Sequence, residues 1–315
     1  MKRFILVTQT VSRLGLLVLL LALNGCASIP YQYGQDLETA TILELKPGES
    51  QIERGKPNSL VDGFGHYFFS LPSKLLLWSW KVDDHTISPE TEVALARYLE
   101  ENGLHNVKVR LNQYSPGSEW RRLVKNKDMP ALFRYTAGVV VNSIYTIFPQ
   151  RVFAGFFAPL GIGDFYNPFT NTIHIYSDHP SIALHEAGHG KDFAEKPRGF
   201  KGWYALMGLL PGFSLYSEAV ASGDAIGYAR EKRLAEEEKD AYRILYPAYC
   251  SYIGAEGLRW VSVDSWLAFT AQLAIAIPGH IAGRIKAAGV DDSPDIHAKI
   301  AIDAHQDWEP VDMFP

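Results

Sequence analysis

Two histidines four residues apart constrain this 315-residue chain more than any other feature. They are His185 and His189, and the turn and proline just before Ser181 indicate that a helix begins there. On a helix this spacing puts both imidazoles on one face, where they can bind one zinc ion. Glu186, beside the first histidine, can hold a water against that metal and accept its proton. The motif therefore predicts a metal-binding helix with Glu186 as the general base.

A catalytic zinc site needs a third protein ligand and keeps its fourth position for water. Glu218 lies in a segment, 216–224, that is rich in small residues and predicted to be helical. Small residues let two helices approach closely enough for a carboxylate on one to reach a metal on the other. Glu195 follows His189 by six residues, and on a continuing helix it is rotated by about 240° and faces away. We therefore favour Glu218 and keep Glu195 as the alternative.

Residues 171–228 resemble the gluzincin metallopeptidases, in which an HExxH helix is followed by a glutamate ligand on a downstream helix. The alternating segment 172–176 precedes the motif as a strand, and in zincins such an edge strand pairs with an extended substrate. The implied fold class is α+β and zincin-like, mostly helical, with a small mixed sheet whose edge strand precedes the HExxH helix. Metzincins place their third ligand at the offset of Glu195, but the glycine that turns their chain is Asp192 here.

The resemblance also suggests which residues lie around the metal. Membrane-associated gluzincins often place an aspartate four residues after the glutamate ligand, where this chain has Ser222. Asp224 comes two residues later, and either a role in orienting a ligand or an ordinary structural role fits it. The attacked carbonyl also needs a donor for its developing charge. The candidates for that donor are Tyr216, Tyr228, His280 and His297.

Other parts of the chain give simpler predictions. Ser88-Pro89-Glu90 is typical of a helix start, and that helix is expected to end at Asn102-Gly103. Residues 107–111 alternate between apolar and polar side chains, which indicates a strand. His174 shares a strand face with Thr172 and Tyr176, so it either faces the cleft or, more simply, is exposed to solvent.

The N-terminus is typical of an exported protein. Lys2, Arg3 and Arg13 accompany an apolar run, 14–23, that suits a signal-peptide core better than a membrane span. The run ends in Leu-Asn-Gly-Cys, which resembles the bacterial lipobox and implies that Cys26 is lipidated. Since Ala27 rather than aspartate follows, the resemblance implies anchoring in the outer membrane, facing the periplasm. The expected organisation is a signal peptide at 1–25, a polar tether at 26–60 and a metallohydrolase domain at 61–315.

Composition narrows the function. The net charge of −5 and the acidic isoelectric point argue against a nucleic-acid partner. Three apolar stretches, at 135–148, 203–216 and 266–277, are shorter than the roughly 20 residues of a membrane span. They are expected to be core helices, and contact with the bilayer surface is the alternative.

The leading functional hypothesis is a lipid-anchored metallopeptidase with one Zn²⁺ and a peptide or protein substrate. The alternatives are an envelope lipoprotein whose zinc site is only structural, closed by Glu195 or Asp192, and a membrane-surface factor without metal.

Overall fold

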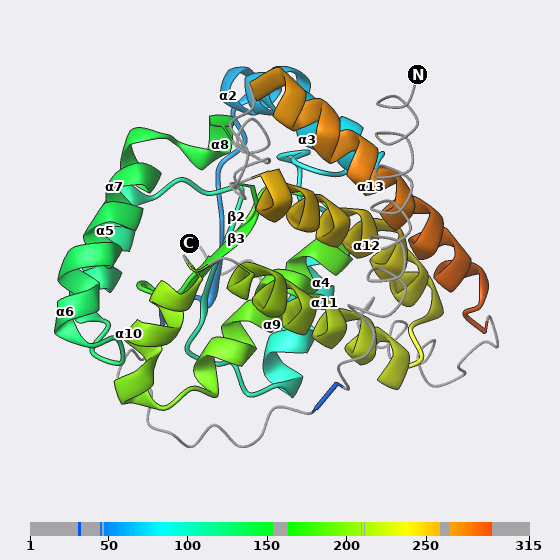
Figure 1. The fold of residues 1–315 in the computed structure, drawn as a ribbon. Helices are drawn as coiled ribbons and strands as arrows, with labels where there is room; N and C mark the ends of the chain where they lie inside the picture. The colour runs from blue at the N-terminus through cyan, green and yellow to red at the C-terminus, as the bar shows by residue number, and fades with distance from the viewer. Residues whose placement is uncertain are drawn as a thin grey trace, which may run out of the picture.

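The structure is a computed structural model that describes residues 31–32, 45, 47–153, 163–208, 210, 212–258 and 265–291. Within these ranges the chain is α+β: helices surround one small mixed sheet (Figure 1). The signal peptide, Cys26, most of the expected tether and His297 lie outside the described residues. None of the described helices is long and apolar enough to cross a membrane.

The sheet has four strands in the order β1-β2-β4-β3. β1 (Ile52–Arg54), β2 (Lys108–Leu111) and β4 (Thr172–Ile175) run parallel, whereas β3 (Phe165–Asn167) is antiparallel to β4. The predicted strand at 107–111 is confirmed as β2. The prediction that the strand before the HExxH helix is an edge strand was wrong. β4 pairs with β2 on one side and β3 on the other, so its backbone groups are already hydrogen-bonded, and β3 forms the edge.

The folded part of the chain begins before residue 61. Residues 52–54 were expected to belong to the tether, yet they form β1 at the other edge of the sheet. Glu53 fixes the strand there, because its carboxylate pairs with both Lys108 and Arg110 of β2. A hydrogen-bonded strand with two buried cationic partners is part of the domain and not a linker.

The HExxH segment lies on α9 (Pro180–Ala194). Three helices pack against α9, and they are α4 (Pro89–Glu101), α11 (Phe213–Glu231) and α12 (Ala235–Leu258). A further helix, α13 (Ser265–Ala288), lies along α12. Ser88 caps α4 as predicted, because its side chain accepts a hydrogen bond from the Thr91 backbone N–H. The remaining helices are α2 (Ser59–Phe64), η2 (Gly65–Phe69), α3 (Leu71–Leu77), α5 (Pro116–Lys125), α6 (Ala131–Phe133), η3 (Arg134–Gly138), α7 (Val139–Ile147), α8 (Gln150–Phe153) and α10 (Arg198–Met207).

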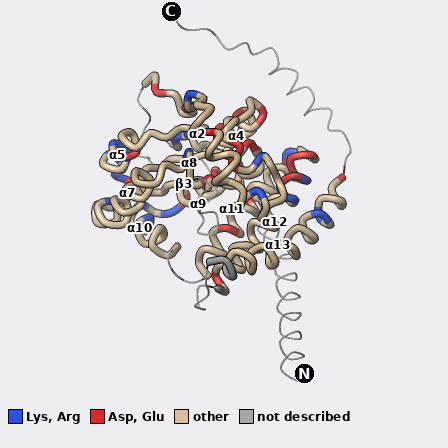
Figure 2. Tube along the Cα trace, turned by 90° about the horizontal axis from the view of Figure 1, so that it is seen from above, with Lys and Arg blue, Asp and Glu red and all other residues tan. Residues whose placement is uncertain are grey.

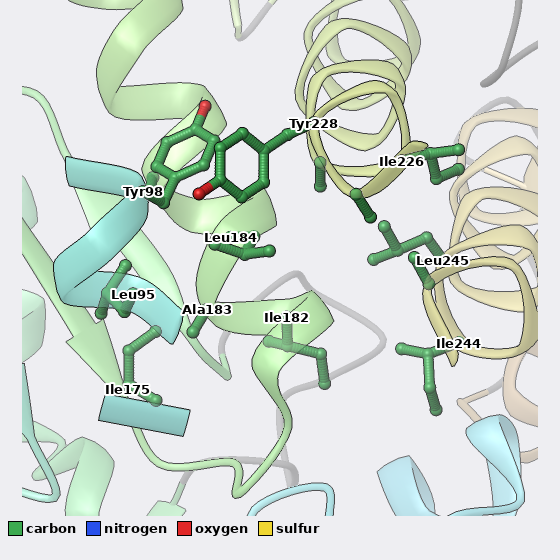
Figure 3. Packing of buried hydrophobic residues seen from close by; sticks show 14 of the residues in the cluster. Leu95, Tyr98, Ile175, Ile182, Ala183, Leu184, Ile226, Tyr228, Ile244 and Leu245 are labelled. Carbon is green, nitrogen blue, oxygen red and sulfur yellow. The ribbon is translucent and has the colours of Figure 1, made fainter. Parts of the chain in front are cut away.

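The main core joins these helices to the sheet. In Figure 3, Leu95 of α4 and Ile175 of β4 lie on one side of α9, and Ile244 and Leu245 of α12 lie on the other. The first turns of α9 therefore run through the middle of the core. The burial of Ala183 and Leu184, one or two residues before His185, fixes the helix on which the motif sits.

A buried polar network holds the sheet on its other face. Arg110 of β2 is fully buried, and its Nε donates to Glu119 Oε1 of α5 over 2.8 Å. Its other nitrogens donate to Glu53 Oε2 at 2.7 Å and to Ser118 Oγ at 2.7 Å. One guanidinium therefore ties β1, β2 and α5 together through charge-assisted hydrogen bonds.

Helices α9 and α11 approach closely at Gly188, inside the motif. A Cβ added there would lie 3.1 Å from the Ala221 backbone oxygen and 3.2 Å from its Cα. These are atoms of the α11 backbone, three residues from Glu218, so they cannot move aside without moving that residue.

We therefore expect Gly188→Ala to push α11 away from α9 and to weaken metal binding, with a cost of about 1–3 kcal/mol in the free energy of unfolding from overpacking. Metal titration and urea unfolding measure the two effects. Gly199→Ala in α10 is the control, because an added Cβ there meets nothing within 4 Å. Equal metal affinity in Gly188→Ala and wild type would contradict this account of the contact.

Candidate metal centre

The structure brings His185 and His189 of α9 together with Glu218 of α11. The two Nε2 atoms lie 3.1 Å apart, His185 Nε2 lies 3.1 Å from Glu218 Oε2, and His189 Nε2 lies 3.4 Å from Glu218 Oε1. His185 is buried, and the other two are half-buried. These three side chains could hold a metal ion.

Ser222, one turn after Glu218, contacts the far side of the His185 ring, with 3.2 Å between Oγ and Nδ1. If Nδ1–H donates to this hydroxyl, Nε2 keeps its lone pair and points it at Glu218 and His189. A metal-binding histidine needs this tautomer. Ser222 thus occupies the place where the resemblance led us to look for an aspartate.

The charges of the three groups depend on one another. Burial alone would lower the pKa of His189, but the adjacent Glu218 carboxylate outweighs it and raises that pKa to about 9. In return, His189 and His185 hold the pKa of Glu218 well below its usual range, against the effect of burial. Glu218 is therefore ionised and attracts positive charge to the point between the imidazoles.

Glu186 lies beside the ligand group and is almost fully buried. Burial raises the pKa of its carboxyl to about 7, and the charges of Glu218 and Asp164 add to that rise while the two histidines oppose it. A carboxyl near neutrality can accept a proton and give it back, as a general acid–base group must.

Two cavities meet at this group. The first is lined by His185 and by residues of α3 and α12. The second is lined by His189, by β3 and by α10. Four residues line both cavities, and they are Asp164, Glu186, Glu218 and Tyr252. The candidate metal centre therefore has open space on both sides.

Glu195, the rival third ligand, does not join this group: it is exposed at the end of α9. Asp192 is engaged elsewhere, since its carboxylate accepts hydrogen bonds from Lys196 and Tyr204. No fourth protein ligand accompanies the three among the described residues.

The other predicted residues lie away from the metal centre. Asp224 pairs with Lys191 at 2.7 Å and accepts a hydrogen bond from Tyr98, so it orients neither histidine. Tyr228 donates its hydroxyl to Glu101, and Tyr216 is 53% exposed and lines neither cavity. His280 Nε2 lies 2.9 Å from the carbonyl oxygen of Leu76, and the His280 ring stacks on Trp78.

The predictions for His174 were wrong. The side chain neither faces the cleft nor reaches solvent: it is fully buried, stacked on Phe165 with ring centroids 4.5 Å apart. Its Nε2 lies 3.6 Å from Glu119 Oε2, so it joins the buried network around Arg110. β4 carries two buried faces because the sheet is covered on both sides, and alternation alone does not reveal this.

Sequence reasoning missed Tyr252 of α12. It lines both cavities with Glu186 and Glu218, and the Glu218 charge, together with burial and the Glu186 charge, raises the pKa of its hydroxyl well above the usual value. The hydroxyl therefore stays protonated and can donate. The local sequence carried no signal for this role, because the position of Tyr252 depends on how α12 packs against α9.

Comparisons with protein families, with curated proteins and with solved structures gave no match to this chain.

Proposed function

We propose that this chain is a zinc-dependent metallopeptidase of the gluzincin type, with His185, His189 and Glu218 as zinc ligands and Glu186 as general base. One observation carries the proposal: the two imidazole Nε2 atoms lie 3.1 Å apart, and each lies 3.1 or 3.4 Å from one of the two carboxylate oxygens of Glu218. Ligands about 2.0–2.1 Å from a tetrahedral zinc ion are about 3.3 Å from one another. The donor set and its spacing therefore fit this metal.

Zinc bound here would make a water nucleophilic and polarise the substrate carbonyl. The carboxylate of Glu186 accepts the proton of the attacking water and later delivers it to the leaving amine. Tyr252 donates its hydroxyl to the oxygen on which negative charge develops. Because Asp192 and Glu195 stay away from the ligand group, the geometry favours an open catalytic site over a closed structural one.

The surroundings support a peptide as substrate. Phe165 and Tyr166 of β3, the edge strand, line the second cavity with His189 and Glu186. An edge strand can pair with an extended peptide and lay it across the site. The two cavities give such a chain room on both sides of the bond to be cut, so the proposed activity is cleavage within a chain. The lipobox at Cys26 adds a lipid anchor in the outer membrane, facing the periplasm, to this proposal.

Metal analysis tests the ligand set. Purified in zinc-containing, chelator-free buffer, the wild-type chain should hold one zinc ion per molecule. Glu218→Ala should lower zinc affinity more than about 100-fold, because loss of a direct ligand costs more than loss of an outer partner. Glu195→Ala is the control and should keep its zinc. A metal-free wild type, or zinc lost from Glu195→Ala alone, would contradict the assignment.

Kinetics test Tyr252. We expect Tyr252→Phe to lower kcat on a general protein substrate by about 10²–10³-fold with little change in KM, because the donor acts on charge that forms only during reaction. Tyr249→Phe is the control, since Tyr249 lines only the first cavity. A fall in kcat of the same size in both variants would show that the tyrosines shape the cavity and that neither is the donor.

A further inference from the structure

Exposed apolar side chains gather at one end of the molecule, on two segments far apart in sequence. Figure 1 shows α2, α3 and α13 side by side along one edge of the fold, and α3 packs against both η2 and α13. We call this surface the apolar face, and it consists of Leu60, Phe64, Tyr67, Phe68, Leu71, Leu75, Trp78, Trp80, Ile277, Ile281 and Ile285.

Its side chains form two ordered stripes. On and just after α3, Leu71, Leu75 and Trp78 recur at helical spacing and are 39%, 57% and 58% exposed. On α13 the isoleucines at 277, 281 and 285 recur every four residues and are 46%, 50% and 60% exposed. The Trp78 ring stacks on His280 of α13 with centroids 3.8 Å apart, which joins the stripes into one surface. Stripes of this kind are normally covered by an apolar partner.

Most of the helices that carry the apolar face contain basic residues and no acidic ones, and the nearby Asp84 is paired with His66 of η2. Helices η2, α3 and α13 contain no Asp or Glu, and Asp62 of α2 is paired with Arg151. α13 contributes Arg284 and Lys286, and the Arg284 guanidinium lies 5.0 Å from the centroid of the Trp78 ring. In Figure 2 the tube of α13 is uncharged over most of its length, with its basic residues toward one end.

We infer that the apolar face rests on the surface of an anionic phospholipid bilayer. Tryptophan and tyrosine favour the layer between headgroups and acyl chains, and nearby arginine and lysine attract anionic lipids. The absence of a spanning helix among the described residues fits contact with the surface. Cys26, the expected lipid anchor, lies 34 residues before Leu60, close enough in sequence to hold this face at high local concentration near the lipid.

This inference does not rest on zinc, but it bears on the substrate of the proposed peptidase. Leu76 and Leu77 of α3 line the first cavity, whereas Leu71, Leu75 and Trp78 of the same segment point to the apolar face. One short helix therefore separates the candidate metal centre from the bilayer. The favoured substrate is a polypeptide segment that lies at the membrane surface.

Bromolipid quenching tests the contact. The full chain, purified from membranes with its N-terminal anchor, is reconstituted into vesicles of brominated phosphatidylcholine with phosphatidylglycerol, and its tryptophan fluorescence is compared with that in unbrominated vesicles. We expect quenching in wild type and loss of most of it in Trp78→Phe/Trp80→Phe. Trp120→Phe is the matched control: Trp120 is on α5, where its Nε1 donates to Thr146, and its replacement should leave the quenching largely intact.

The outcomes separate the possible partners. Equal quenching in wild type and Trp78→Phe/Trp80→Phe would overturn the inference, as would an equal loss in Trp120→Phe. A dimer in detergent that Ile281→Glu converts to a monomer, with quenching unchanged, would assign the face to a second copy of the chain. Equal quenching without phosphatidylglycerol would remove the preference for anionic lipid. Zinc content, measured on the same samples, keeps a failure here distinct from failure of the proposed metal centre.

Discussion

Glu186→Gln is expected to abolish hydrolysis while the protein keeps its zinc. Glutamine has nearly the same shape as glutamate but cannot accept the proton of the attacking water, so kcat should fall by at least about 10³-fold. The proposed ligands His185, His189 and Glu218 are untouched, so the zinc content should equal that of wild type. Cleavage of a general protein substrate and metal analysis of the same preparations measure the two quantities.

The change should not weaken the fold. Because burial raises the pKa of Glu186, ionising this carboxyl opposes folding at neutral pH, and a neutral glutamine avoids that cost. Thermal unfolding at pH 8 should therefore occur at the same temperature or a higher one. Glu195→Gln, the same substitution at the exposed end of α9, is the control and should keep full activity. Equal cleavage by Glu186→Gln and wild type would refute the assigned base.

Arg110→Ala is expected to give the largest loss of stability, about 3–5 kcal/mol in the free energy of unfolding at pH 7. The substitution leaves Glu119 ionised, buried and without its arginine partner, and it removes one of the two cations that pair with Glu53 of β1, where Lys108 remains. Urea unfolding followed by circular dichroism measures this loss, provided that the free energy of unfolding falls with urea concentration at the same slope in both proteins. Arg243→Ala is the control: its pair with Asp240 is about half exposed, so the loss should stay within about 0.5 kcal/mol.

Two further measurements identify the cause of that loss. Burial opposes ionisation of Glu119, yet the nearby His174 ring and the Arg110 charge hold the pKa of Glu119 at about 2. This pKa is below the unfolded value, so the stability that it contributes is present above pH 4.5 and is lost as the pH falls toward 2. The difference in the free energy of unfolding between wild type and Arg110→Ala should therefore become smaller as the pH falls from 4.5 toward 2. Arg110→Met/Glu119→Leu should recover most of the loss, because both members of the buried ion pair are replaced by apolar side chains and neither charge is left without its partner. A double variant as unstable as Arg110→Ala would show that packing of the guanidinium, and not the unpaired charge, is responsible.

Local signals predicted those parts of the molecule that depend on local chemistry. Capping by Ser88 and the alternation at 107–111 placed α4 and β2, because both effects operate within a few residues. The histidine spacing placed both imidazoles on one face of α9, and the small residues around Glu218 indicated that α11 comes close. Each of these signals describes a helix or strand by itself.

The parts that were wrong depend on how elements meet. The strand predicted at 172–176 was expected at an edge, although Asn171, which adopts a positive φ of 52°, marks the turn into it from β3. Recognising that turn would have predicted a partner on this side of β4. The sequence around Tyr252 and Asp224 offered no such signal. The packing of α9, α11 and α12 decides which face of α12 meets the candidate metal centre. The same packing brings Asp224 to Lys191.

The contact at Gly188 has a consequence for the order of events in metal binding. Backbone packing against Ala221 fixes the distance between α9 and α11 within the motif itself, so contacts that involve no metal ion hold the helices of the three proposed ligands together. In small zinc domains the ion organises the chain, and its removal unfolds them. In the proposed metal centre the hydrophobic core would meet the cost of organising the ligands, and their full affinity would remain for holding the ion.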